Sequence, residues 1–207
     1  MSDILNGLNP QQKEAVMHTE GPLLILAGAG SGKTRVLTHR IAYLIENGFA
    51  EPEDILALTF TNKAAKEMKE RAASLTGKAA DKMLITTFHS ACVKFLKNRM
   101  MLLGYKRGNF VIYDTDEQKK IIRTIFEETD FQSRCPEIKE YNVISFISKQ
   151  KEKMLGPDEL ESIYPDYPLV TVYKEYERIL KKNNALDFDD LLVKTVELFQ
   201  SKQEVLE

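Results

Sequence analysis

Short apolar runs alternate with helical patterns along the first hundred residues. Each run has the length of a buried strand and is followed by apolar side chains spaced three or four residues apart. The expected strands are residues 22–26, 55–60 and 83–88, and the expected helices are residues 33–46, 61–71 and 89–103. Three successive strand–helix units predict an α/β fold with a parallel sheet and right-handed crossovers.

The alternation stops near residue 108, and the pattern that follows is mostly helical. Phe110–Asp114 fits a short strand or an extended lead-in, and Thr115 with Gln118 predicts a capping box for a helix that ends near Thr129. Further helices are expected at residues 141–152, 158–162 and 168–183, with prolines between them. This stretch is expected to be a helical insertion with its own small core. Helical spacing favours packing for most of its tyrosines, Tyr164, Tyr167, Tyr173 and Tyr176.

A glycine-rich loop follows the first apolar run. Residues 27–34 read Ala-Gly-Ala-Gly-Ser-Gly-Lys-Thr and match the phosphate-binding P-loop (Walker A) pattern except for Ala27 in first place. Backbone amides and the next helix N-terminus would hold phosphates, Lys33 would reach the β- and γ-phosphates, and Thr34 would ligate Mg²⁺. The alternative is a glycine-rich turn before a surface lysine, but the flanking strand and helix favour nucleotide binding.

A further helix is expected before the loop, at residues 8–18. Asn9 is a suitable N-cap, and Pro10 would occupy the first helical position, where its missing N–H costs nothing. A glutamine amide can pair with both N6 and N7 of adenine, so Gln11 and Gln12 are candidate base contacts.

Two expected strand ends share a composition, Thr59-Phe60-Thr61-Asn62 and Thr86-Thr87-Phe88-His89-Ser90. The carboxyl ends of parallel strands meet at one edge of a sheet, where ligands bind. Aromatic rings stack on bases, and hydroxyls contact phosphates without reading sequence. For either motif alone, a core phenylalanine beside a helix cap is the favoured alternative; the two together favour single-stranded DNA.

Charge adds a second indication of a polyanion. The net charge is −2, yet residues 62–107 hold eleven Lys or Arg against three Asp or Glu. Composition alone slightly favours the alternative, a solvated lysine-rich helix face. No apolar run is long enough to span a membrane, and the N-terminus lacks a secretory pattern. Cys92 and Cys135 fit neither a metal site nor a disulfide framework, so a reduced, cytoplasmic protein is expected.

An acidic segment closes the pattern, with Asp187, Asp189 and Asp190 within four residues. A metal site is one interpretation. The favoured interpretation makes Asp187 an N-cap and places the other two in the first turn of a helix, where the helix dipole stabilises negative charge.

Taken in order, these motifs resemble those of the superfamily 1A DNA helicases of the UvrD/Rep/PcrA group, and above all its PcrA members. The resemblance covers essentially the whole chain. The matching segments are Leu8–Val16 with the adenine-reading Q motif, 27–34 with motif I including its alanine, 58–65 with motif Ia, 87–90 with the next strand-contacting motif, and 186–191 with the acidic motif.

The resemblance implies a RecA-like P-loop NTPase fold with a parallel sheet, formed by residues 1–107 and 186–207 (domain 1A), and an inserted, mostly helical domain 1B at residues 108–185. It implies an ATP-dependent DNA helicase that uses ATP and Mg²⁺, moves 3′ to 5′ along single-stranded DNA and unwinds duplex junctions in DNA repair and replication. The implied nucleotide contacts are Gln12, Ala27, Gly28, Ala29, Gly30, Ser31, Gly32, Lys33, Thr34 and Arg35, with Lys33 and Thr34 also catalytic and Thr34 on the metal. The implied DNA contacts are Thr59, Phe60, Thr61, Asn62, Lys63, Thr87, Phe88 and His89.

Two other interpretations stay open, an AddA/RecB-type helicase–nuclease fragment and a non-catalytic DNA-binding P-loop module. A small-molecule kinase or a GTPase is disfavoured, because no acceptor pocket with a lid and no Asn-Lys-x-Asp motif is found. The resemblance places the Asp-Glu pair that holds Mg²⁺ and activates water beyond residue 207, and Glu204–Glu207 does not match it. The 207-residue chain alone is therefore expected to bind nucleotide or DNA weakly and to lack helicase and nearly all ATPase activity.

Overall fold

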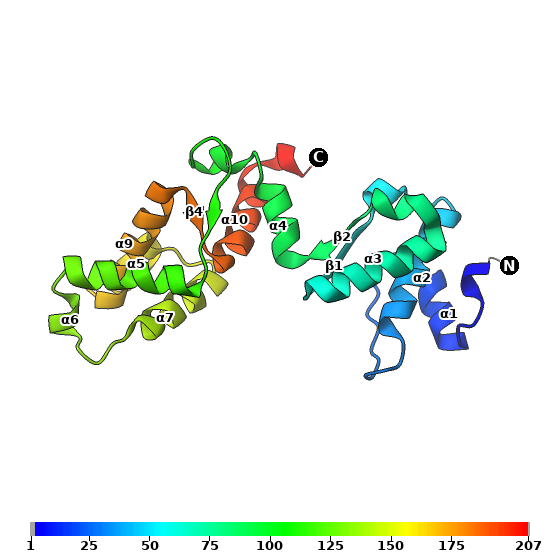
Figure 1. The fold of residues 1–207 in the computed structure, drawn as a ribbon, viewed down its shortest axis with the longest axis horizontal. Coiled ribbons are helices and arrows are strands. Elements are labelled where there is room, and N and C mark those ends of the chain that lie inside the picture. The colour runs from blue at the N-terminus through cyan, green and yellow to red at the C-terminus, as the bar shows by residue number, and fades with distance from the viewer. Residues whose placement is uncertain (1–2, 207) are drawn as a thin grey trace. The chain divides into compact units, whose positions relative to one another are not determined.

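Two compact units make up the protein, Met1–Ala91 and Cys92–Glu207 (Figure 1). The structure is a computed structural model that describes residues 3–206. The division between the units falls within helix α4 (Phe88–Leu96). Within residues 3–206, no helix combines the length and the apolar character needed to cross a bilayer.

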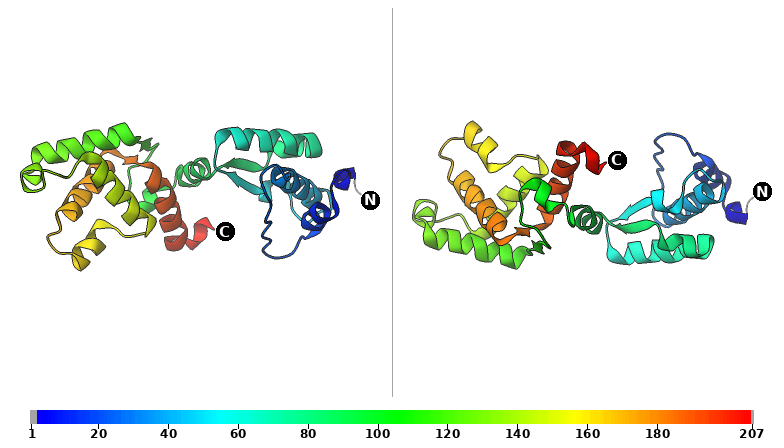
Figure 2. Two further views of the ribbon diagram at one scale, coloured as in Figure 1. Left: turned by 90° about the horizontal axis from the view of Figure 1, so that it is seen from below. Right: turned by 90° about the horizontal axis from the view of Figure 1, so that it is seen from above.

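A parallel strand pair forms the centre of the first unit. β1 (Leu56–Thr59) pairs with β2 (Leu84–Thr87), and Thr59 lies opposite Thr87. The crossover helix α3 (Asn62–Thr76) lies along the pair in both views of Figure 2, and α2 (Lys33–Glu46) packs against α3. The shared core contains Ile41, Ile55, Met68, Ala72, Ala80, Met83 and Ile85. The predictions of the second and third strands, their parallel pairing and the helix at residues 33–46 are confirmed.

The N-terminal helix α1 (Pro10–Met17) begins as the sequence predicts. The Asn9 side chain accepts from the Gln12 N–H at 2.8 Å, and Gln12 Oε1 accepts from the Asn9 N–H at 3.0 Å. This reciprocal capping box satisfies two N–H groups that the helix itself leaves unpaired. Val16 is fully buried against Leu8 and against Val36 of α2, so α1 is fixed to the helix that follows the glycine-rich loop.

The prediction of a strand at residues 22–26 is wrong. Residues 22–28 adopt no regular structure, and the side chains of Leu24 and Leu26 are 80% and 86% exposed. A strand exists only through hydrogen bonds to a neighbouring strand. Among residues 3–206, β1 and β2 pair only with each other, so this apolar segment has no partner to complete the expected three-stranded sheet.

Helices α5 (Thr115–Glu128), α7 (Glu140–Glu152) and α9 (Pro168–Asn183) build the core of the second unit. Their most deeply buried side chains are Ile122, Ile125, Val143, Ile147, Tyr176 and Leu180. α8 (Pro157–Ile163) packs on α9, and α6 (Phe131–Arg134), which the sequence did not predict, stacks Phe131 on Phe126 at 4.8 Å between ring centroids. The expected helices and their separate core are confirmed. Tyr173 and Tyr176 are buried as expected, whereas Tyr164 and Tyr167 are exposed.

A second parallel pair, β3 (Val111–Ile112) with β4 (Ala185–Leu186), precedes α10 (Phe188–Ser201). Buried residues of α4, of the 3-10 turn Met100–Leu103, of β4 and of α10 share one cluster, Cys92, Leu96, Met100, Leu186, Leu191 and Leu198. The remaining 3-10 turns are Asp3–Leu5, Pro52–Asp54, Gly77–Asp81 and Gln203–Val205. Because the compact units divide the chain at a different place, the assignment of residues 1–107 and 186–207 to one domain and 108–185 to another stays a prediction.

Two helix boundaries differ from the prediction. The N-cap of α5 is Asp114 and not Thr115, and Glu117, not Gln118, closes its capping box. An aspartate is as good an N-cap as a threonine. Because Glu117 completes the capping box, the Gln118 side chain is available for the contact with Tyr176 described below. α4 ends at Leu96, well before residue 103, and Asn98 follows it with a left-handed backbone (φ 65°).

The unpaired apolar segment gives a direct test of this fold. Leu8 is 7% exposed and Leu26 is 86% exposed. We expect Leu8→Ala to lower the free energy of unfolding by about 2–5 kcal/mol. The same change at Leu26 should cost less than about 0.5 kcal/mol. Urea denaturation of both variants measures the difference, and equal losses would mean that residues 22–26 are buried after all.

Candidate functional site

The glycine-rich loop leads directly into α2. Gly30 and Gly32 have φ values of 76° and 89°, in the left-handed region that glycine adopts without strain. Gly32 is also the N-cap of α2, and no side chain accepts from the first N–H groups of the helix. These N–H groups, with the positive end of the helix dipole, form a site suited to a phosphate.

Lys33 lies folded against this loop. Its Nζ donates to the carbonyl oxygen of Ala27 at 3.0 Å and to that of Gly28 at 2.7 Å. Ser31 Oγ also donates to the Gly28 carbonyl at 2.7 Å. Ala27 therefore contributes through its backbone, which explains physically why alanine can replace the usual first glycine.

Gln12 connects α1 to the loop. While its Oε1 completes the capping box, its Nε2 donates to the carbonyl oxygen of Ser31 at 3.1 Å. A side chain at Gly32 would lie within 3.1 Å of the same Nε2, so the close approach depends on glycine. Of the two candidate glutamines, the structure thus brings Gln12 to the loop, while its role as an adenine contact stays a prediction.

Phe60 and Phe88 lie side by side where β1 and β2 end. Their ring centroids are 5.5 Å apart with an angle of 41° between the planes. Phe60 is 92% exposed and Phe88 is 40% exposed, so the alternative that these rings belong to the core is wrong. The first unit therefore presents two aromatic rings at the strand ends, as the interpretation of a base-stacking surface requires.

The threonines at this edge have structural contacts. Thr61 accepts from the Ala64 N–H at 3.1 Å and caps α3, and Thr59 Oγ1 donates to the Thr61 carbonyl. Thr87 Oγ1 donates to Ser90 Oγ at 2.9 Å. Asn62, Lys63 and His89 are further exposed polar residues at this edge.

The positive block at residues 62–107 divides into two different parts. Around α3, four exposed basic side chains form ion pairs, Lys66 with Glu70, Lys69 with Asp81, Arg71 with Glu67 and Lys82 with Glu53. This part is largely the solvated helix face of the alternative interpretation. The basic residues from Lys94 onwards belong to the second unit.

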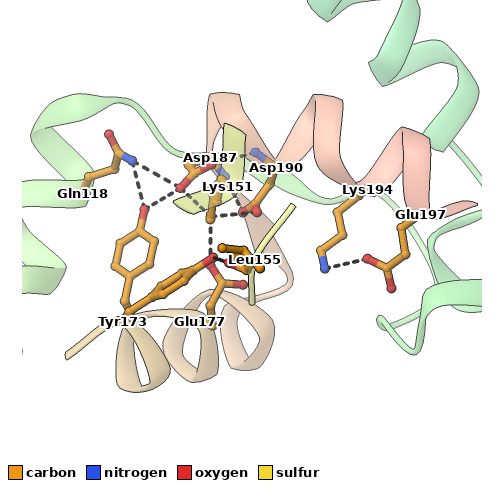
Figure 3. Close-up of polar contacts among 10 residues, drawn as sticks. Gln118, Lys151, Leu155, Tyr173, Glu177, Asp187, Asp190, Lys194 and Glu197 are labelled. Atoms are coloured by element: carbon orange, nitrogen blue, oxygen red, sulfur yellow. Dashed lines mark hydrogen bonds and ion pairs between the residues drawn. The ribbon is translucent and has the colours of Figure 1, made fainter. Parts of the chain in front are cut away.

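The acidic segment lies in a buried ion cluster of the second unit (Figure 3). Lys151 of α7 is 3% exposed, and its Nζ lies 2.8 Å from Asp187 Oδ2, 2.7 Å from Asp190 Oδ1 and 2.8 Å from Glu177 Oε1. The prediction of Asp187 as an N-cap is confirmed, since it accepts from the Asp190 N–H at 2.8 Å. Lys151 was missed, although it follows Val143 and Ile147 at a spacing of four on the buried face of α7.

Hydrogen bonds from Tyr176 and Gln118 extend this cluster. The Tyr176 hydroxyl donates to Asp187 Oδ2 at 2.9 Å, and Gln118 Nε2 donates to the Tyr176 oxygen at 3.0 Å. Within residues 3–206, no group of three or more His, Cys, Asp or Glu is arranged to hold a metal ion. Asp187 caps α10 and both Asp187 and Asp190 pair with Lys151, so these two side chains make structural contacts.

Burial and the neighbouring charges separate the two aspartates. Burial raises the pKa of Asp190 to about 7, against the attraction of Lys151. Burial also acts to raise the pKa of Asp187, but the charge and hydrogen bond of Lys151 lower it overall. Burial opposes the charge on Lys151, yet the surrounding carboxylates hold its pKa well above the ordinary value.

The raised pKa of Asp190 predicts a pH-dependent stability. The ordinary pKa of the Asp190 carboxyl is 3.8, so in the unfolded state this carboxyl loses its proton above about pH 4. In the folded state it keeps the proton up to a pH of about 7. The folded state binds more protons in this window, so the contribution of Asp190 to stability falls as the pH rises from about 4 to about 7. We expect Asp190→Asn to remove this decrease, as measured by urea denaturation across the window. Asp189→Asn is the matched control, and an unchanged pH dependence in Asp190→Asn would contradict the assignment.

The sequence matches the family model of the UvrD/REP helicase N-terminal domain over residues 8–207. It is 46% identical over 209 residues to the ATP-dependent DNA helicase PcrA of Bacillus subtilis (strain 168), and 46% identical over 210 residues to the protein of the same name from Staphylococcus aureus (strain Mu50). Each alignment covers the whole of this chain and only 28% of the length of the relative. The chain belongs to the UvrD/REP helicase N-terminal domain family, as its motifs predict.

Proposed function

We propose that this chain is the ATP- and single-stranded-DNA-binding N-terminal part of a 3′–5′ ATP-dependent DNA helicase that acts on duplex junctions in repair and replication in the cytoplasm. Family membership and relatives named as ATP-dependent DNA helicases support this function. The chain spans 28% of the length of those relatives, so the unwinding of DNA is proposed for a longer protein of which this chain is a part. The parallel β1–α3–β2 crossover supports a RecA-like P-loop fold for the first unit.

The loop and the start of α2 fit a nucleotide. The uncapped N–H groups after Gly32 would hold its phosphates, and the Lys33 ammonium would turn from the loop carbonyls to the β- and γ-phosphates. Thr34 would ligate Mg²⁺, Arg35 follows in the same turn, and Gln12 would contact adenine. When bound, ATP and Mg²⁺ supply a phosphoryl group for transfer to water and the charge that stabilises this transfer.

The exposure of Phe60 is the observation that carries the DNA-binding part of the proposal. A phenylalanine that is 92% exposed gains nothing from the core, whereas a base stacked on its ring would bury it. Phe88 contacts the ring from the start of α4, and the exposed Asn62, Lys63 and His89 are suited to contact the sugar–phosphate chain.

The Phe60 proposal is tested by alanine substitution. Because stacking on an aromatic side chain contributes about 1–3 kcal/mol per base, Phe60→Ala should weaken binding of a single-stranded oligonucleotide by about 5- to 100-fold. Phe49→Ala is the matched control, since Phe49 is also exposed in the first unit but stacks on Tyr43. Fluorescence anisotropy measures both affinities, and a loss of the same size in the two variants would argue against a stacking role.

The nucleotide site is tested in the longer parent protein. Lys33→Ala removes the ammonium that reaches the loop backbone, so we expect ATP hydrolysis to be lost and the binding of a fluorescent ATP analogue to weaken. Lys78→Ala, an exposed lysine of the same unit, should leave both unchanged. If hydrolysis survives in Lys33→Ala, this residue is not a P-loop lysine.

A further inference from the structure

Six exposed basic side chains of the second unit lie on two segments that contact each other, residues 97–107 and the end of α9. This group, named here the basic surface, comprises Lys97, Arg99, Lys106, Arg107, Lys181 and Lys182. In the part of the chain that the structure describes, none of them forms an ion pair with a carboxylate, unlike the basic residues around α3. Two of the six lie outside the positive block of residues 62–107, so the sequence pattern alone did not connect them with it.

Specific contacts bring these residues together. The Lys106 N–H donates to Asn184 Oδ1 at 3.0 Å, and Lys106 Nζ donates to the carbonyl oxygen of Lys182 at 3.0 Å. The Lys181 Nζ lies 5.7 Å from the centroid of the Tyr105 ring. The segment between α4 and β3 is thereby fixed to the end of α9, next to the paired strands β3 and β4 (Figure 1).

A cavity of about 440 Å³ opens among these side chains. It is lined by Asn98, Met100, Met101, Lys106, Arg107 and Gly108. The polar side chains of this lining are an ammonium, a guanidinium and an amide, and no carboxylate contributes to it. Met101 is 56% exposed, so an apolar surface lies beside the cationic groups.

Helix chemistry explains only part of this concentration of charge. Lys181 and Lys182 lie in the last turn of α9, where the helix dipole favours cations, and Lys106 satisfies a carbonyl there. Lys97 directly follows the end of α4, where the same dipole effect applies, but neither reason applies to Arg107. Like charges close together repel one another, and an anionic partner would relieve this repulsion.

We propose that the basic surface binds the sugar–phosphate chain of single-stranded DNA, as a contact additional to Phe60. The proposal rests on the proposed function, which supplies this polyanion. The lysines and arginines would contact phosphates, and the exposed Met101 beside them would receive an unstacked base, which a duplex does not offer.

The test compares two triple variants that lose the same charge. Lys97→Gln/Arg107→Gln/Lys182→Gln removes three charges of the basic surface, at side chains that form no hydrogen bond or ion pair in the described part of the chain. Lys120→Gln/Lys149→Gln/Lys153→Gln is the control, at exposed lysines of the same unit. The affinity of each 207-residue protein for an oligothymidylate is measured across a series of salt concentrations.

Each phosphate contact on a single strand contributes about 0.7 to the slope of log affinity against log salt. We expect the first triple variant to reduce the slope by about 2, for three lost contacts, and the control to keep the wild-type slope. Equal slopes in the two variants would overturn the proposal. A larger effect on duplex than on single-stranded DNA would also overturn it, by assigning the surface to duplex.

The same measurements separate this inference from the proposed function. Phe60→Ala should weaken binding at every salt concentration without changing the slope. If only Phe60→Ala has an effect, the basic surface is not a DNA contact and the proposed function stands. If only the triple variant has an effect, the basic surface is the contact and the stacking role of Phe60 falls.

Discussion

The start of α2 is the constraint around which the first unit is arranged. A helix must satisfy its first N–H groups, and here the N-cap is a glycine with no side chain to do so. The neighbouring groups are placed accordingly, because Gln12 holds the Ser31 carbonyl from α1 and Lys33 holds two loop carbonyls from within the helix. The backbone N–H groups of α2, the Lys33 ammonium and the Gln12 amide thus lie together at the start of α2. A phosphate site requires such groups.

Features set by local sequence could be predicted, and features set by distant partners could not. Asn9 and Asp187 cap helices as expected, because a cap depends on residues three positions away. The strand at residues 22–26 failed because its hydrogen bonds require a neighbouring strand. Lys151 was missed because Asp187 and Asp190 lie 36 and 39 residues further along the chain. Likewise, the sequence left open whether Phe60 is buried, and only the packing of β1 and β2 decides it.

The two units are stabilised by different physics. In the first, apolar side chains from three helices and two short strands provide the core, and the exposed ion pairs add little. In the second, a charged group lies within the helical core and is tolerated because three carboxylates surround it. Lys151 consequently fixes the relative positions of α7, α9 and α10, since removing any one partner leaves uncompensated charge in a low-dielectric interior.

The leucines at positions 24 and 26 have a consequence for the behaviour of the chain in solution. A stretch that exposes apolar side chains and belongs to neither of the described sheets is a template for another extended chain. Two copies of the protein can satisfy each other there, so self-association should grow with concentration. A polypeptide that extends alongside this stretch would suppress that aggregation and make the protein more soluble.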